Sequence, residues 1–316
     1  MSLHLFGAIV THHGTAANNR AETEGNITTL QKLLWHGRVH STVSAEAIRF
    51  ALRRRLGEHE ETNRYWVESG SKPMNAWHDP GFGRWAEGGS YIDDDVMGFM
   101  SAEAAKQDGA DVPPADGEPP ADPKAKGTAT IRRSPLEVTR AVSLVPYGGD
   151  VTFNAASPGA TPSAQKGEKG VSNPVPYGTE VHATRYQYGF ALTPGALRKP
   201  ERAAIAIRAL CGLGEVAGNH GRFLYDFSPE SLVLRITHDP APRLLYIFET
   251  AGAGVDATEL LKRVESEDVP AAELIIGGGF ASTKTAEALK ALGATVVPGV
   301  RKAGDIACER IAAGGA

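Results

Sequence analysis

The sequence predicts an α+β fold whose strand and helix order is compatible with the ferredoxin-like arrangement, interrupted by large insertions. The expected order is strand, helix, two strands, helix and strand, at residues 3–10, 45–56, 130–145, 180–192, 203–216 and 231–237. Stretches rich in Gly, Pro, Ala and Ser at 102–127 and 157–178 interrupt this order, and the first has almost no large apolar residue. Such a composition buries too little to order itself, so we expect the core to lie outside these stretches.

The first strand and the first helix have the clearest local signals. Residues 3–10 are rich in β-formers and alternate loosely, which predicts a buried strand. Ser44 is a natural N-cap, Glu46 suits the positive helix end, and Gly57 is expected to end the helix in a left-handed conformation. The apolar residues that share one face at helical spacing are Ile48, Ala51, Leu52 and Leu56.

The remaining elements follow from alternation and turn residues. The extended runs on either side of residues 157–178 predict a long projecting hairpin between about Val142 and Leu192. The last part of the chain alternates between strands expected at 243–249, 273–276 and 294–298 and helices expected at 256–265, 282–292 and 301–312. These patterns give one large domain without an internal repeat.

Positive charge is concentrated in one stretch of a chain whose total charge is -4. Between Asn26 and Arg55, six basic residues face the single acid Glu46, a local charge of +5; they are Lys32, Arg38, Arg49, Arg53, Arg54 and Arg55. Arg49 and Arg53 are four residues apart and so share a helix face. This pattern indicates a surface that holds phosphates, and a solvated helix face is the alternative interpretation.

The loop before the helix adds groups suited to an anionic ligand. Ser41, Thr42 and Ser44 supply hydroxyls at a helix start, where an anionic oxygen is well received. The short amides that reach backbone or sugar groups are Asn18, Asn19 and Asn26. We therefore expect residues 18–56 to form the main binding surface.

This region resembles the RNA-contacting part of the CRISPR-associated autoregulator family (DevR-like). The family is the repeated backbone subunit of type I Cascade surveillance complexes. The matching features are the strand LHLFGAIV, the pattern from Asn18-Asn19 to Gly25-Asn26, Lys32, and the run from Ser44 to Arg53. Glu46 stands where the family commonly has Gln. Two further strings also resemble the family: the acidic string at 91–100, found in its finger insertion, and Gly218 to Arg222.

The resemblance implies an RNA-recognition-type palm at 1–60, 128–141 and 188–316, a finger insertion at 61–127 and a thumb hairpin at 142–187. In the family the thumb wedges between guide nucleotides. The expected partners are CRISPR guide RNA, further copies of the chain, other Cascade subunits and the target DNA strand paired to the guide. The residues expected to contact RNA are Asn18, Asn19, Asn26, Lys32, Arg38, Ser41, Ser44, Arg49, Arg53, Arg133, Tyr147, Asn219, His220 and Arg222.

We interpret the chain as a non-catalytic scaffold that stacks head to tail along guide RNA, with no cofactor, metal or catalytic residue. The aromatic signature strings of ordinary RNA-recognition motifs are missing, so gripping of the RNA backbone is favoured over base stacking. A guide-processing endoribonuclease is the alternative, with His12, His13 or His40 as general acid or base. A nucleotide-binding enzyme is a weaker one, because the glycines at 277–279 lack the spacing of a phosphate-binding loop.

Composition sets the remaining expectations. A length of 316 residues with 41% apolar content fills a core without disulfides, and the two cysteines, Cys211 and Cys308, fit a reducing compartment. The first residues lack a basic leader, and no apolar run reaches membrane-spanning length. We expect a soluble cytoplasmic protein. Asp93, Asp94 and Asp95 could suggest a divalent metal, but metal sites usually draw ligands from several segments.

Overall fold

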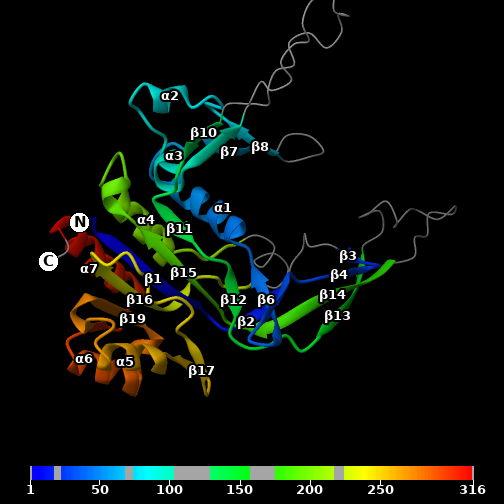
Figure 1. The fold of residues 1–316 in the computed structure, drawn as a ribbon. Helices are drawn as coiled ribbons and strands as arrows, with labels where there is room; N and C mark the ends of the chain where they lie inside the picture. Colours follow the sequence, from blue (N-terminus) through cyan, green and yellow to red (C-terminus); the bar gives the residue numbers. More distant parts are fainter. Residues whose placement is uncertain are drawn as a thin grey trace, which may run out of the picture.

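The computed structural model describes residues 2–17, 23–67, 74–102, 129–156, 175–216 and 224–314, and within these it confirms the α+β class (Figure 1). A central sheet of nine strands forms the middle of the molecule. In spatial order its strands are β20 (Thr295–Val297), β19 (Leu274–Gly278), β16 (Pro229–Thr237), β1 (His4–Thr11), β15 (Tyr186–Leu192), β12 (Ala141–Ser143), β6 (Arg38–Val43) and β5 (Lys32–Trp35), with β11 (Leu136–Val138) also paired to β15.

Strand β1 organises the sheet because it lies between β15 and β16 and is antiparallel to both. Its side chains alternate between the two faces, and both faces are buried. Leu5 and Ile9 join one core cluster, whereas Phe6, Ala8 and Val10 join another. The predicted buried first strand is thus confirmed, and it separates two hydrophobic layers.

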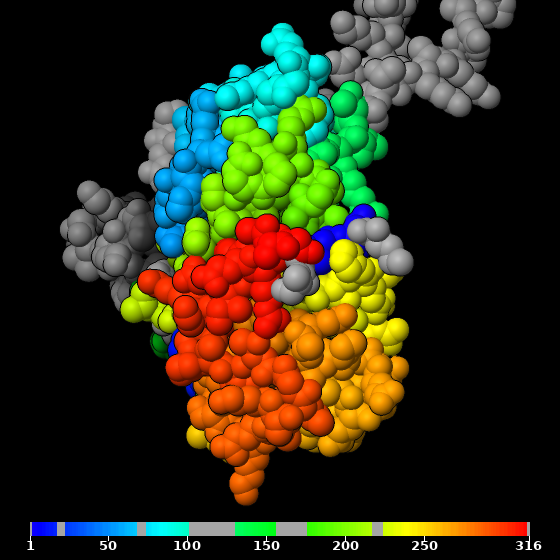
Figure 2. Space-filling model, turned by 90° about the vertical axis from the view of Figure 1, so that its left-hand side faces the viewer, coloured from blue at the N-terminus to red at the C-terminus, as the bar shows by residue number. Residues whose placement is uncertain are grey.

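Helices cover both faces of this sheet. On the side of Leu5 and Ile9 lie α1 (Ala45–Leu56), α4 (Arg202–Cys211) and α7 (Val300–Ala312), which Figure 2 shows as one continuous outer face in blue, green and red. On the other side lie α5 (Thr258–Glu265) and α6 (Lys284–Ala291), where Phe280, Leu260 and Leu289 fill the core. In helix α1, Ser44 is the N-cap and the predicted apolar stripe is buried.

A hairpin of β13 (Val151–Ala156) and β14 (Val175–Thr184) projects from the sheet. Strand β14 also pairs with β2 (Gly14–Ala17) and, in parallel, with β4 (Ile27–Thr28), whose own partner is β3 (Thr23–Glu24). Residues 23–28, which include Asn26, therefore lie along this projecting hairpin, whose described strands are residues 151–156 and 175–184.

The segment between α1 and β11 forms a separate outgrowth over the helical layer (Figure 1). Its elements are β7 (Arg64–Val67), β8 (Met74–Trp77), α2 (Gly83–Ala86), α3 (Ile92–Met97), β9 (Phe99–Ala102) and β10 (Ala129–Arg132). Aromatic residues fill it, for example Phe82 and Phe99, whose rings stack 3.8 Å apart. The remaining short elements are β17 (Glu249–Ala251), β18 (Gly254–Asp256), and 3-10 turns at Pro194–Ala196, Ala271–Glu273 and Gly279–Ser282.

Helix α3 carries the three adjacent aspartates, and their carboxylates bind protein groups. Asp93 accepts hydrogen bonds from Arg53 Nε at 3.1 Å and from the amide of Asn63 at 2.7 Å. Asp95 accepts from Arg132 and Arg202 at 2.8 and 3.0 Å. Within the described ranges, no group of three or more His, Cys, Asp or Glu is arranged to hold a metal ion.

Three local predictions from the sequence are wrong. Gly57 follows α1 but has φ -63°, because its N–H bonds to Arg53 O and the chain continues in helical turns. Helix α4 ends at Cys211 instead of Val216, before two closely spaced glycines that disfavour helix. Residues 243–248 are not a strand: the side chain of Gln187 bonds both the N–H and the C=O of Phe248, in place of a strand partner.

Within the described residues, no helix has the length and apolarity needed to span a bilayer.

The pKa of Asp94 predicts a pH-dependent stability. Burial, and then the neighbouring Asp93 charge, raises this pKa from 3.8 to about 7. The ionised Asp94 therefore opposes folding fully above about pH 7, and this penalty disappears below the unfolded pKa. We expect Asp94→Asn, which keeps an acceptor for Asn63, to raise the melting temperature by about 2–4 °C at pH 8.5 and less at pH 5. Thermal denaturation at both pH values measures this.

Asp95→Asn is the matched control on the same helix. This substitution removes the charge of Asp95 from a buried ion pair. The free energy of unfolding should therefore fall by about 3–5 kcal/mol at both pH values, and the melting temperature should fall with it. An Asp94→Asn variant that loses as much stability as Asp95→Asn would contradict the assignment of a destabilising charge at Asp94.

Candidate nucleic-acid interface

The root of the projecting hairpin brings together residues that the sequence analysis singled out separately. Lys32 and Ser41 are directly opposite in the β5–β6 pair and so point to the same face. That face meets β14, where Lys32 Nζ lies 2.6 Å from Glu180 Oε1 and Ser41 Oγ lies 2.6 Å from His182 Nδ1. The hairpin is thereby fastened to the edge of the central sheet.

Tyr147 completes this cluster on its exposed side. Its ring centroid lies 5.3 Å from Lys32 Nζ and 5.5 Å from the His182 ring. Burial, followed by the negative charge of Glu180, raises the pKa of Tyr147 to about 12, so the phenol is neutral at physiological pH. Lys32, Tyr147 and Glu180 therefore form a polar, partly exposed group beside the hairpin.

Ser41 itself lies inside the root. Its hydroxyl bridges His182 and the buried phenol of Tyr186, which is 2.8 Å away, and its side chain is fully buried. Burial lowers the pKa of His182, which favours a neutral imidazole in this network. A direct RNA contact by Ser41 stays a prediction, while its structural partners are now identified.

Arg38 presents an open positive charge beside a tight turn. His36 and Gly37 both have positive φ, which is typical of a two-residue hairpin turn between β5 and β6. Arg38 follows this turn and is exposed, and its guanidinium group has no hydrogen-bond or ion-pair partner among the described residues. Asn26, in contrast, donates to Pro176 O on the hairpin at 3.2 Å.

Arg49 and Arg53 lie in a different place and have intramolecular partners. Arg49 donates to Met97 O and Leu136 O at 2.5 and 3.1 Å, and Arg53 pairs with Asp93. Burial, and then the Arg53 charge, lowers the pKa of Arg49. Both guanidinium groups hold α1 to the outgrowth, so an RNA contact by them would have to replace existing bonds and stays a prediction.

Two of the other residues expected to contact RNA have partners within the protein, and five lie outside the described residues. The Ser44 hydroxyl accepts from Ala47 N as a helix cap, and Arg133 is highly exposed while pairing with Glu137 at 2.9 Å. Five expected contacts lie outside the described residues: Asn18, Asn19, Asn219, His220 and Arg222.

The histidines considered for the alternative endoribonuclease lie in different environments. His40 is buried, with its Nδ1 2.7 Å from Ser143 O, whereas His12 and His13 are exposed. His13 lines a hollow of about 350 Å³ at the foot of the hairpin, together with Arg185 and the turn at 250–253.

The glycine run at 277–279 has a packing role. A Cβ at Gly277 would lie 2.6 Å from the Cβ of Ala303 on α7. Gly278 has φ +93°, and a Cβ there would lie 2.1 Å from Glu230 O. Strand β19 therefore needs glycine at these positions to approach α7 and β16 closely. This packing explains the glycines without a phosphate-binding role.

Sequence reasoning missed Glu180, His182 and Tyr186 as partners of the site. The available signal was the alternation of the strand from 180 to 192, which places Glu180 and His182 on one face. That alternation could not show which strand contacts this face. The contacting strands, β5 and β6, lie 140 or more residues earlier in the sequence.

Comparison with known proteins gives consistent matches. A family model described as CRISPR-associated negative auto-regulator DevR/Csa2 matches residues 89–215. Chains of two solved complexes share the fold. One, from a CRISPR RNA-guided surveillance complex, has a TM-score of 0.56 at 12% identity and covers 98% of this chain and 99% of its own. The other, from such a complex in a pre-nicking state, has a TM-score of 0.58 at 9% identity and full coverage of both.

A relative with much higher sequence identity decides the family. The chain is 58% identical over 317 residues to CRISPR-associated protein Cas7/Cst2/DevR of Myxococcus xanthus (strain DK1622), and the match covers 98% of each chain. With this identity over nearly the whole length, the chain belongs to the Cas7/Cst2/DevR family of CRISPR-associated proteins.

Proposed function

We propose that this protein is a non-catalytic backbone subunit that binds guide RNA in a type I CRISPR surveillance complex. The observation that carries the proposal is the 58% identity to a Cas7/Cst2/DevR protein across 98% of the chain. Its partners would be the guide RNA, further copies of itself, other subunits of the complex and the DNA strand paired to the guide. The shared fold with chains of surveillance complexes supports this role.

The root of the hairpin is the proposed place of contact with the RNA backbone. Lys32 supplies positive charge there, and Asn26 and Tyr147 supply polar groups. Arg38 adds an exposed positive charge at the turn end of the same β5–β6 pair, on the opposite face from Lys32. Phosphate contacts of this kind give affinity without reading sequence, which leaves the bases free to pair with a target.

The proposed parts of a hand-like domain are a ferredoxin-like palm, a finger at 61–127 and a thumb at 142–187. Support for the palm comes from the neighbouring strands β16, β1, β15 and β11, all antiparallel. With α1 and α4 on one face, these strands follow the order 4-1-3-2 expected of a ferredoxin-like sheet, which supports the proposed palm. The thumb corresponds to the projecting hairpin and its root.

Head-to-tail assembly is supported by exposed apolar side chains on two unlike regions, the hairpin with strand β5 and the outgrowth. Phe153 on the hairpin is 80% exposed, and Leu34 on β5 is 71% exposed. On the outgrowth, Met100 and Ile131 are opposite each other on β9 and β10 and are 68% and 67% exposed. Unlike apolar surfaces of this kind can meet between copies and extend a chain of subunits.

The first test concerns RNA affinity. We expect Arg38→Glu to weaken binding of unrelated RNA sequences about equally, by about tenfold, and to reduce the salt slope by about one. The reason is that Arg38 is exposed and unpaired within the described chain. Filter binding or fluorescence anisotropy across salt concentrations measures both effects.

Lys290→Glu is the matched control, because Lys290 is exposed on α6, on the other side of the molecule from the hairpin (Figure 1). It changes net charge equally and should leave RNA binding within about twofold. Equal weakening by both variants would mean that net charge alone causes the effect, and it would remove Arg38 as an RNA contact. Arg49 and Arg53 are poor choices for this test because their replacement also breaks intramolecular bonds.

The second test concerns assembly and catalysis together. Mass photometry of the full chain with RNAs of increasing length should show complexes that grow in steps of one subunit. An RNA too short for two subunits serves as the control and should give a single bound copy. A fixed dimer at every length would contradict the filament, and shortened RNA after incubation would favour the endoribonuclease instead.

A further inference from the structure

Helices α1, α4 and α7 form a face that lies away from the projecting hairpin (Figures 1 and 2). Residues of these helices and of the segments that follow α1 and α4 line a basic hollow. Its volume is about 330 Å³, which is within the range of small-ligand sites. The lining residues are Arg55, His59, Arg208, Ala209, Cys211, Gly212, Arg301, Gly304 and Asp305. Three arginines and one aspartate give the lining a net charge of +2 when His59 is neutral.

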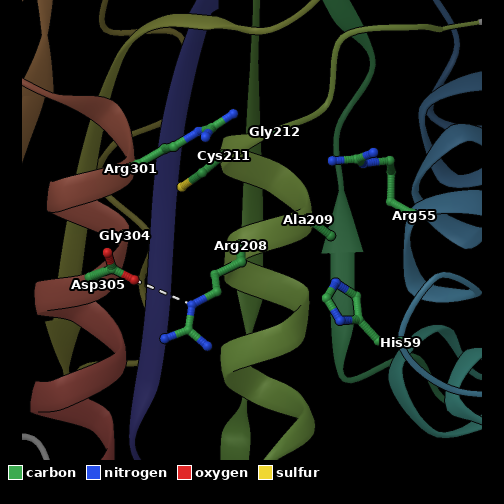
Figure 3. A pocket seen from close by; sticks show the side chains of 9 residues that line it. All are labelled: Arg55, His59, Arg208, Ala209, Cys211, Gly212, Arg301, Gly304 and Asp305. Atoms are coloured by element: carbon green, nitrogen blue, oxygen red, sulfur yellow. Dashed lines mark hydrogen bonds and ion pairs between the residues drawn. The ribbon is translucent and has the colours of Figure 1, made fainter.

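Two guanidinium groups in this hollow have N–H donors that no described residue uses. Arg301 reaches in from α7 and Arg55 from α1, on opposite sides of the end of α4 (Figure 3). Arg301 has no ion-pair or hydrogen-bond partner among the described residues, and Arg55 uses Nη1 for Glu58 at 2.9 Å. The single lining carboxylate, Asp305, is already paired with Arg208 at 3.2 Å.

Two glycines shape the hollow. A Cβ at Gly304 would lie 2.7 Å from Cys211 Sγ, so glycine lets α7 pack closely against α4. A Cβ at Gly212 would lie 3.2 Å from Arg55 Nη2, so glycine lets this guanidinium lie over the end of α4. Burial raises the pKa of the Cys211 thiol to about 12, which keeps the floor uncharged and leaves recognition to the arginines.

We propose that this hollow is a binding site for a compact phosphate group, such as a phosphate monoester or pyrophosphate, held between Arg301 and Arg55. Each planar guanidinium group can donate two parallel hydrogen bonds to two phosphate oxygens. Two such groups that line one hollow suit an anion with more than one negative charge. Glu58 and Glu215 pair with Arg55 and Arg54 at the α1 side, so among the described residues the basic groups of this face do not form a continuous track. A terminal or free phosphate fits this arrangement better than the middle of a strand.

The experiment is titration calorimetry of pyrophosphate into the full-length protein at constant ionic strength. We expect saturable binding at one site and at least tenfold weaker binding for Arg301→Ala and for Arg55→Ala. Lys302→Ala is the matched control: Lys302 is also exposed on α7 but does not line the hollow, and binding should stay within twofold. Circular dichroism verifies that each variant is folded.

Two further arms separate the possible sources of the phosphate. A mononucleotide tests a free ligand, and a short oligonucleotide with a 5′-phosphate, compared with its 5′-hydroxyl form, tests a strand end. Binding that depends on Arg301 in either arm supports the proposal and shows whether the phosphate belongs to a free nucleotide or to the end of a strand.

Three outcomes would overturn the proposal. They are no saturable binding, equal weakening by Arg301→Ala and Lys302→Ala, and hexaglutamate binding as tightly as pyrophosphate with the same dependence on Arg301. Guide-RNA binding by Arg301→Ala should remain unchanged, so failure of this site and failure of the proposed function give different results.

Discussion

A buried ion-pair network around Asp95 is the interaction on which the arrangement of the outgrowth depends. Asp95 and Arg202 are 0% and 1% exposed, and Asp95 also binds Arg132 and the backbone N–H groups of Arg198 and Lys199. A buried carboxylate is tolerated only when such partners satisfy it. The network therefore links α3, α4 and β10 in one geometry, and an uncompensated change at any member leaves a charge in the interior.

The same constraint divides the arginines of α1 between two tasks. Arg53 faces α3, where Asp93 receives it, and Arg49 binds backbone carbonyls nearby. Arg55, two positions after Arg53, instead faces the end of α4 and the hollow beside α7. The arginines of α1 look alike in sequence, yet Arg49 and Arg53 hold the fold together while Arg55 lines the proposed anion site.

Local signals in the sequence predicted elements whose causes are local. The Ser44 cap and the stripe including Ile48 and Leu52 could be read from spacing, and so could the buried first strand. Partners distant in sequence could not be read: nothing near Arg49 indicates that it meets Met97, and nothing near Phe248 indicates that Gln187 replaces a strand partner. In the candidate site, Lys32 and Tyr147 were predicted from the sequence, but Glu180 was not, because it contacts Lys32 from 148 residues away.

The root of the hairpin places a buried hydrogen-bond network beside the residues that we propose to contact RNA. Ser41, His182 and Tyr186 form a buried hydrogen-bonded chain, and losing one member would leave a buried polar group unsatisfied at a cost of about 1–3 kcal/mol. Lys32, directly opposite Ser41, is already neutralised in part by Glu180 at 2.6 Å, so a phosphate must compete with that carboxylate. Arg38 has no such competitor within the described chain. In the proposed role, then, Arg38 should contribute more to RNA affinity than Lys32, although both lie on the same strand pair.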